Sequence, residues 1–285
     1  MTTRLPLGSV VVGVDGSSHS NVALSWAIAQ ATRERRPLVI AHATGAAPHG
    51  LTGEGAHHAA QERRIEGTRV VEKAFATAVS ANSDLHVETL VRAQSPRHLL
   101  IELSQHARVV VIGSRGLGTL GSIALGSVSV AVSSGAHCPV VVARDAVQKD
   151  TASIVVGVDG TAASSGALEF AFAQASERGV LLRVVHGSAT VPFDQQGDGT
   201  YDEVRLAESL AGLREKYVDV VVETEITPRA AVDRLVEVSR EADLLVVGAR
   251  AHHGPAAALL GSVSQVVVEK ARCSVAVVHP LVDAH

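Results

Sequence analysis

Residues 10–16 read VVVGVDG, and residues 154–160 read IVVGVDG, so nearly the same heptapeptide occurs twice in the chain. Each copy opens with a continuous run of β-branched residues, which is typical of a strand buried on both faces of a parallel sheet. In the first copy, Ser17, Ser18 and Ser20 then offer side-chain oxygens for a helix N-cap. The stretch therefore predicts a buried strand that leads into a helix at the start of each half of the chain.

A second repeated stretch indicates that the whole domain is duplicated. LGSVS at 125–129 recurs at 260–264, and Cys138 matches Cys273 at the same spacing of 135 residues. The heptapeptides are 144 residues apart, so the first copy carries nine extra residues in its middle. Such a period is far too long for a solenoid repeat. We predict a first domain over 1–147 and a second over 152–285, joined by a short polar linker.

Strand-like and helix-like segments alternate in each copy. In the first copy, strands are expected at 9–14, 37–43, 85–91, 108–112 and 139–143, and helices at 21–35, 62–81, 96–106 and 126–136. In the second copy, strands are expected near 153–158, 180–186, 218–226, 243–247 and 274–278. The alternation predicts an α/β fold of two tandem doubly wound domains, each with a five-stranded parallel sheet. Ligands of such sheets bind beyond the carboxyl ends of the strands.

The bulk properties of the chain argue against several classes of function. A net charge of -4 gives no sign of a nucleic-acid partner, and no apolar run is long enough to span a membrane. The apolar run near the N-terminus is too short for the core of a signal peptide, which predicts a cytoplasmic protein. Two cysteines do not make a disulfide framework, and the pairs His57-His58 and His252-His253 lack the spacing of a zinc protease, so no metal site is expected from them.

The glycine-rich stretch GSRGLGTLGSIALGS at 113–127 fits three phosphate-loop patterns. Gly116-x-Gly118-x-x-Gly121 matches a dinucleotide fingerprint, but the positions that correspond to its glycines in the second copy are Ala251, His253 and Ala256. A P-loop ending at Gly126 lacks its lysine, because Ser127 stands in that place. Both of these patterns are therefore disfavoured.

The third pattern is Gly-x-x-Gly, nine residues, and then Gly-Ser, and most of it recurs. Gly113 matches Gly248, Arg115 matches Arg250, and the pair at 126–127 recurs at 261–262. A helix N-terminus presents free N–H groups and a positive dipole end, so a Gly-Ser pair at a helix start suits a phosphate. Two interpretations stay open from the residues alone: a phosphate site, or glycine and serine that merely end a strand and cap a helix.

This third pattern, preceded by VVVGVDGS at 10–17 and followed by HCPVVVAR at 137–144, resembles the universal stress protein family over nearly the whole chain, as two tandem copies. The resemblance implies an adenine nucleotide alpha hydrolase-like fold and ATP with Mg²⁺ as the cofactor. It implies that the glycine motif wraps the phosphates, that the Asp after the first strand lies near the ribose and phosphates, and that the end of the second strand meets the adenine.

Carried over position by position, the resemblance implies one site in each copy. The first would use Gly13, Val14, Asp15, His42, Ala43, Gly113, Ser114, Arg115, Gly116, Leu117, Gly118, Gly126, Ser127, Val128 and Ser129. The second would use Gly157, Val158, Asp159, His186, Gly187, Gly248, Ala249, Arg250, Ala251, Gly261, Ser262, Val263 and Ser264.

Two residues depart from the family pattern. Ala251 replaces the second glycine of the motif, and a positive φ at this position would be strained for alanine. Arg108 stands before the fourth strand, where the second copy has Asp243. We interpret Arg108 as part of a solvated strand edge with little bearing on the site.

The function implied by the resemblance is that of an ATP-binding regulatory protein in a stress response, which acts as a homodimer with an unknown protein partner. No dedicated general base is visible, so we assign no catalytic residue and expect slow ATP hydrolysis at most, supported by Asp15 with a divalent ion and by Arg115. The alternatives are a slow ATPase or phosphotransfer enzyme, and a structural dimer that binds no nucleotide.

Overall fold

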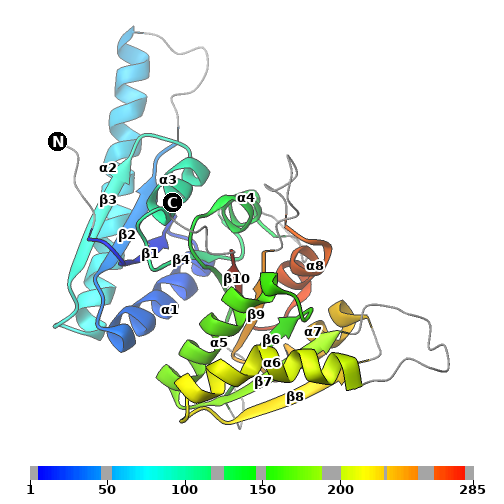
Figure 1. Ribbon diagram of the computed structural model, residues 1–285. Coiled ribbons are helices and arrows are strands. Elements are labelled where there is room, and N and C mark those ends of the chain that lie inside the picture. The colour runs from blue at the N-terminus through cyan, green and yellow to red at the C-terminus, as the bar shows by residue number, and fades with distance from the viewer. Residues whose placement is uncertain are drawn as a thin grey trace. The chain divides into compact units, whose positions relative to one another are not determined.

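The computed structural model describes residues 6–45, 53–116, 125–145, 152–187, 200–227, 230–249 and 260–279. Contacts divide the chain into two compact units, unit 1 (Met1–Arg144) and unit 2 (Asp145–His285), and Figure 1 labels most of their elements. In the part of the chain that the structure describes, every helix is too short or too polar to span a bilayer.

Unit 1 alternates strands and helices along the chain. Its elements are β1 (Val10–Gly13), α1 (Ser18–Glu34), β2 (Leu38–Ala43), α2 (Gly53–Ala81), β3 (Val87–Arg92), α3 (Pro96–Ser104), β4 (Val109–Gly113), α4 (Ser127–Gly135) and β5 (Val140–Ala143). The strands lie in the order β3-β2-β1-β4-β5, and all of the neighbouring pairs are parallel. The strand order therefore reverses between β1 and β4, which is the place where doubly wound sheets bind ligands.

Unit 2 repeats this topology. Its elements are β6 (Ser153–Val158), the 3₁₀ turn η1 (Ala162–Ser164), α5 (Ser165–Arg178), β7 (Leu181–Gly187), α6 (Thr200–Lys216), β8 (Val222–Thr227), α7 (Ala231–Val238), β9 (Leu244–Gly248), α8 (Ser262–Lys270) and β10 (Ser274–Val278). Its strands lie in the order β10-β9-β6-β7-β8, again all parallel. The predicted α/β class with two five-stranded parallel sheets is confirmed.

The central strands of each sheet form the core. The side chains of Val10 and Val110 in unit 1, and of Val156 and Val246 in unit 2, are completely buried, as the continuous β-branched runs predict. Of the three serines that could cap the first helix, Ser17 is the N-cap, and its side chain accepts a hydrogen bond from the backbone N–H of Ser20 at 3.2 Å.

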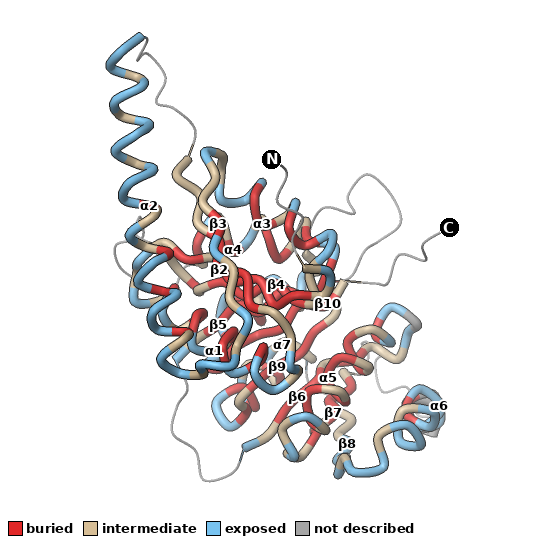
Figure 2. Tube along the Cα trace, turned by 90° about the vertical axis from the view of Figure 1, so that its left-hand side faces the viewer, coloured by how far each residue is buried: buried red, intermediate tan, exposed pale blue. Residues whose placement is uncertain are grey.

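α2 begins nine residues earlier than the sequence predicts. Its buried residues are Gly67, Val71, Ala74 and Ala78, all in the second half of the helix. Figure 2 shows the first half as an almost continuous exposed segment. Because this half buries no apolar face, apolar periodicity carries no signal for it.

The interpretation of Arg108 as a solvated edge is wrong in one respect. Its Nε lies 3.5 Å from Oε2 of Glu34 at the end of α1, and Arg36 approaches the same oxygen at 3.0 Å. The Glu34 side chain is only 6% exposed, so this carboxylate is held inside by two guanidinium groups. In unit 2 the residue that corresponds to Arg108 is Asp243, whose carboxylate accepts the N–H of Ser153 at 2.9 Å.

Candidate functional site

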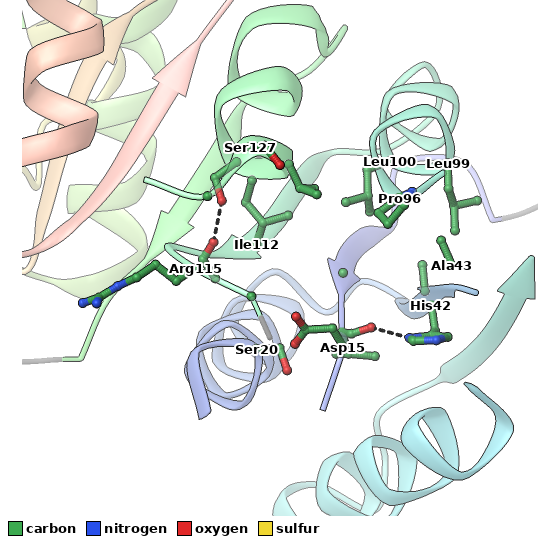
Figure 3. A pocket seen from close by; sticks show the side chains of 18 residues that line it. Asp15, Ser20, His42, Ala43, Pro96, Leu99, Leu100, Ile112, Arg115 and Ser127 are labelled. Carbon is green, nitrogen blue, oxygen red and sulfur yellow. Dashed lines mark hydrogen bonds between the residues drawn. The ribbon is translucent and has the colours of Figure 1, made fainter. Parts of the chain in front are cut away.

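A cavity of about 330 Å³ opens at the carboxyl ends of β1, β2 and β4, at the reversal of strand order in unit 1 (Figure 3). Every residue predicted for the first site lines it except Ser114, which is buried behind it, and Leu117 and Gly118, which lie outside the described residues. The topology thus brings together three segments that are far apart in the sequence, since each follows a strand that ends at the same edge.

One side of the cavity is the start of α4. Gly126 is the N-cap, and its N–H donates to the carbonyl of Ser114 at 3.0 Å. The hydroxyl of Ser129 donates to the carbonyl of Gly113 at 2.9 Å. These two bonds tie the helix start to the end of β4, so the first-turn N–H groups, which have no partner within a helix, are held at the cavity. The Ser129 hydroxyl therefore serves the backbone.

Two glycines of the motif lie where neighbouring atoms leave no room for a side chain. A Cβ on Gly113 would lie 2.7 Å from the carbonyl oxygen of His19 in α1, and a Cβ on Gly116 would lie 2.7 Å from Oδ2 of Asp15. Gly116 is not among the described residues with positive φ, and Ala251, for which a positive φ would be strained, lies outside the described residues. The constraint on Gly116 is the neighbouring carboxylate.

The side chains of Asp15 and His42 both form hydrogen bonds to the backbone just after β1. Oδ1 of Asp15 accepts the N–H of Ser17 at 3.0 Å. Nδ1 of His42 lies 2.8 Å from the carbonyl oxygen of Val14, a bond that Figure 3 shows as a dashed line. A carbonyl oxygen only accepts, so Nδ1 of His42 carries the proton. The ring also packs on Gly67 of α2, where a Cβ would lie 2.7 Å from its Cδ2.

The opposite side of the cavity is apolar, and sequence reasoning missed it. Pro96, Leu99 and Leu100 of α3 lie across from Ala43 at the end of β2 in Figure 3, and Ala41 of the same strand also lines the cavity. Ser20 and Ile112 complete the lining. The apolar residues of α3 follow the ordinary pattern of a core helix, so nothing in the sequence separates a cavity wall from a packed core. Such a wall suits an adenine ring in a chain with few aromatic side chains.

Unit 2 places its predicted residues at the same topological positions. Gly157, Val158 and Asp159 lie at the end of β6, His186 and Gly187 at the end of β7, Gly248 and Ala249 at the end of β9, and Gly261, Ser262, Val263 and Ser264 at the start of α8. The hydroxyl of Ser264 donates to the carbonyl of Gly248 at 2.5 Å, as Ser129 does in unit 1. Arg250 and Ala251 lie outside the described residues.

The remaining candidates for chemistry are structural. Cys138 and Cys273 are both buried. Burial raises the pKa of the Cys138 thiol to about 12, so it stays protonated and unreactive near neutral pH. Across the described ranges, no group of three or more His, Cys, Asp or Glu side chains is placed to hold a metal ion.

Comparison with known proteins identifies the fold and the duplication together. The sequence model of the universal stress protein family matches residues 7–144 and again residues 151–279. A universal stress protein of Mycolicibacterium smegmatis is 33% identical, over 95% of this chain and 97% of that protein. One of Mycobacterium tuberculosis is 36% identical, over 94% and 96%.

A solved structure agrees with these sequence matches. The crystal structure of a universal stress protein from Archaeoglobus fulgidus superposes with a TM-score of 0.73 at 22% identity, over 95% of this chain and 98% of that one, and so shares the fold. The chain belongs to the universal stress protein family and carries two copies of the family domain in tandem.

Proposed function

We propose that unit 1 binds ATP together with Mg²⁺, and that the chain is a nucleotide-dependent regulatory protein. The observation that carries this proposal is the cavity itself, which has a helix N-terminus with a Gly-Ser start on one side and an apolar wall on the other. This division matches the two chemistries of a nucleotide, a charged phosphate chain and a flat, weakly polar base.

In this proposal the nucleotide lies across the ends of β1 and β4. The adenine packs between Ala43 and the α3 wall of Pro96 and Leu99, where it displaces water from apolar surface. The phosphates lie at the first turn of α4, beside Gly126 and Ser127, and Arg115 supplies a charge-assisted hydrogen bond. Asp15 lies between these two regions, near the ribose and the first phosphates.

The residues present fit Mg²⁺ that enters with the nucleotide. Mg²⁺ is commonly held by one or two carboxylates plus substrate phosphates, and Asp15 is the one carboxylate among the described residues that line this cavity. Bound Mg²⁺ would neutralise phosphate charge. Nδ1 of His42 is committed to the Val14 carbonyl, so that nitrogen is not a base for water. We therefore propose slow hydrolysis at most.

Two measurements test nucleotide binding. The protein is purified and denatured, and the supernatant is chromatographed for adenine nucleotides; the same protein, freed of nucleotide, is titrated with MgATP in a calorimeter. We expect adenine nucleotide in the supernatant or a saturable heat of binding. If neither is found, the proposal is wrong.

The alternative functions make different predictions. A slow ATPase or phosphotransfer enzyme would release phosphate with turnover in the presence of Mg²⁺ and lose this activity in Asp15→Ala. A purely structural dimer that binds no nucleotide would keep every measurable property intact in Gly126→Asp. Family membership also leads us to propose a homodimer with an unidentified protein partner, and light scattering after size exclusion measures the dimer directly.

A further inference from the structure

We infer that nucleotide binding is confined to unit 1, so that each chain binds one ATP although its fold is duplicated. This inference rests on the ATP site proposed for unit 1. It comes from a comparison of matched positions in the two units. Leu100 and Leu235 anchor the match, because each packs on the glycine near the end of its central strand, Gly13 or Gly157.

The end of the crevice that would take the base is closed in unit 2. Gly187 ends β7 in the place of Ala43, and Ala231 begins α7 in the place of Pro96. A Cβ added to Gly187 would lie 2.3 Å from Cβ of Ala231 and 3.1 Å from its Cα. The helix therefore packs directly on the strand end. In unit 1, Ala43 and Pro96 instead both line the open cavity.

One residue of the apolar wall is also replaced by a charged one. The residue that matches Leu99 is Arg234, whose Nε and Nη2 reach the two carboxylate oxygens of Glu225 on β8 at 2.6 and 3.0 Å. Its Nη1 lies 3.1 Å from Glu237. This bidentate geometry holds the guanidinium in place. At this position an adenine in unit 2 would contact the Arg234 guanidinium, which is paired with two carboxylates. In unit 1 it would contact Leu99.

The aspartate after the first strand accepts the N–H two residues further on in both units, from Ser17 at Asp15 and from Thr161 at Asp159. Oδ1 of Asp159 accepts the N–H of Thr161 at 3.0 Å and the hydroxyls of Thr161 and Ser164, each at 2.7 Å. In unit 1 the matching serine, Ser20, donates its hydroxyl to the carbonyl of Ser17. Oδ1 of Asp159 thus accepts three hydrogen bonds from the protein, and a ribose hydroxyl at this oxygen would compete with those donors.

The start of α8 keeps the helix N-terminus that contributes to the phosphate half of the site in unit 1. Gly261 is the N-cap of α8 with φ −60 and ψ 154, close to the φ −66 and ψ 146 of Gly126. The Gly-Ser motif therefore predicts a helix N-terminus in both units, but the residues that would recognise a base differ. The second site implied by the family resemblance is expected not to bind ATP.

The test is a calorimetric titration of the full chain with MgATP, compared with the matched variants Gly126→Asp and Gly261→Asp. Both positions have backbone angles that any residue adopts, and aspartate is a favourable N-cap, so both helices are retained. The new carboxylate lies where a phosphate would bind. We expect one site per chain, an affinity loss of about a hundredfold or more in Gly126→Asp, and unchanged stoichiometry and affinity in Gly261→Asp.

The possible outcomes separate this inference from the function on which it rests. Two sites per chain, or a loss of binding in Gly261→Asp, overturns the inference and leaves ATP binding intact. No binding to the wild-type chain overturns both. Circular dichroism checks that each variant is folded. If Gly126→Asp is not, Asp15→Asn takes its place, with Asp159→Asn as its matched control.

Discussion

Gly116 is constrained by the Asp15 carboxylate, and this constraint leads to a prediction. Gly116→Ala installs the residue that stands at position 251 in the second copy, and its Cβ would lie 2.7 Å from Oδ2 of Asp15. The carboxylate must move away from the cavity. We expect MgATP to bind about tenfold more weakly, since one charged contact is displaced, with little change in Tm.

The control for this substitution is Gly212→Ala on the surface of α6, where an added Cβ has nothing within 4 Å. Alanine in an exposed helix should raise stability by about 0.5–1 kcal/mol and leave ATP binding unchanged. Calorimetry and thermal unfolding of both variants make the comparison. Wild-type affinity in Gly116→Ala would contradict the proposed role of Asp15.

Most polar residues of the cavity could be predicted from the sequence, although Ser20 was not, and the apolar wall could not. Asp15, His42 and Gly113 follow strand-like runs, and parallel topology brings such positions to one edge. Leu99 and Leu100 have the periodicity of any buried helix, so only the packed structure shows that their far side faces a cavity.

The signs of one pair of charges are reversed between the two units. In unit 1 the pair is Glu34 at the end of α1 and Arg108 just before β4. Glu34 and Arg108 correspond to Arg178 and Asp243. Arg108→Asp would leave the buried Glu34 carboxylate beside a second carboxylate, with Arg36 as its remaining cation. We expect a loss of about 1–3 kcal/mol in the free energy of unfolding, measured by urea denaturation.

The double variant Glu34→Arg/Arg108→Asp copies the arrangement of unit 2 and serves as the control. Because it restores opposite charges across the same contact, it should recover part of the lost stability. If the two substitutions are simply additive, the contact between α1 and β4 does not stabilise unit 1.

The bidentate pair between α7 and β8 predicts a dependence of stability on pH. The hydrogen bond from Arg234 lowers the pKa of Glu225 below its usual 4.5. A lowered folded-state pKa stabilises the fold above pH 4.5, and this stabilisation is lost as pH falls through the folded-state pKa. Glu225→Gln should therefore cost about 1 kcal/mol at pH 7 and progressively less below pH 4.5.

Urea denaturation of the wild type and of Glu225→Gln across pH 3–7 measures this difference. Glu223→Gln on the same strand is a suitable control, because Glu223 is more exposed and its contact with Arg183 is longer, at 3.6 Å. A difference between wild type and Glu225→Gln that stays constant down to pH 3 would be evidence against the pair.

The duplication itself could be predicted from two repeated stretches, because strand runs and the Gly-Ser helix start are local signals. The divergence of the two crevices could not be predicted in this way. It depends on how closely Ala231 packs on Gly187 and on which carboxylates Arg234 reaches, and these contacts join residues that are distant in the sequence. The motif kept in both units is therefore a guide to the fold.

Two units with their own cores should be separable. We predict that residues 1–147 expressed alone fold and bind MgATP with the affinity of the full chain, and that residues 152–285 fold without binding it. Circular dichroism and calorimetry of the two fragments check this. ATP binding by the second fragment would contradict the account of unit 2.

The most direct measurement is a crystal structure of the full chain with MgATP. The account predicts adenine between Ala43 and Leu99 in unit 1, phosphates within hydrogen-bonding distance of the backbone N–H of Ser127, and no nucleotide in unit 2. Nucleotide bound elsewhere in unit 1, or no nucleotide in that cavity at saturating concentration, would contradict it.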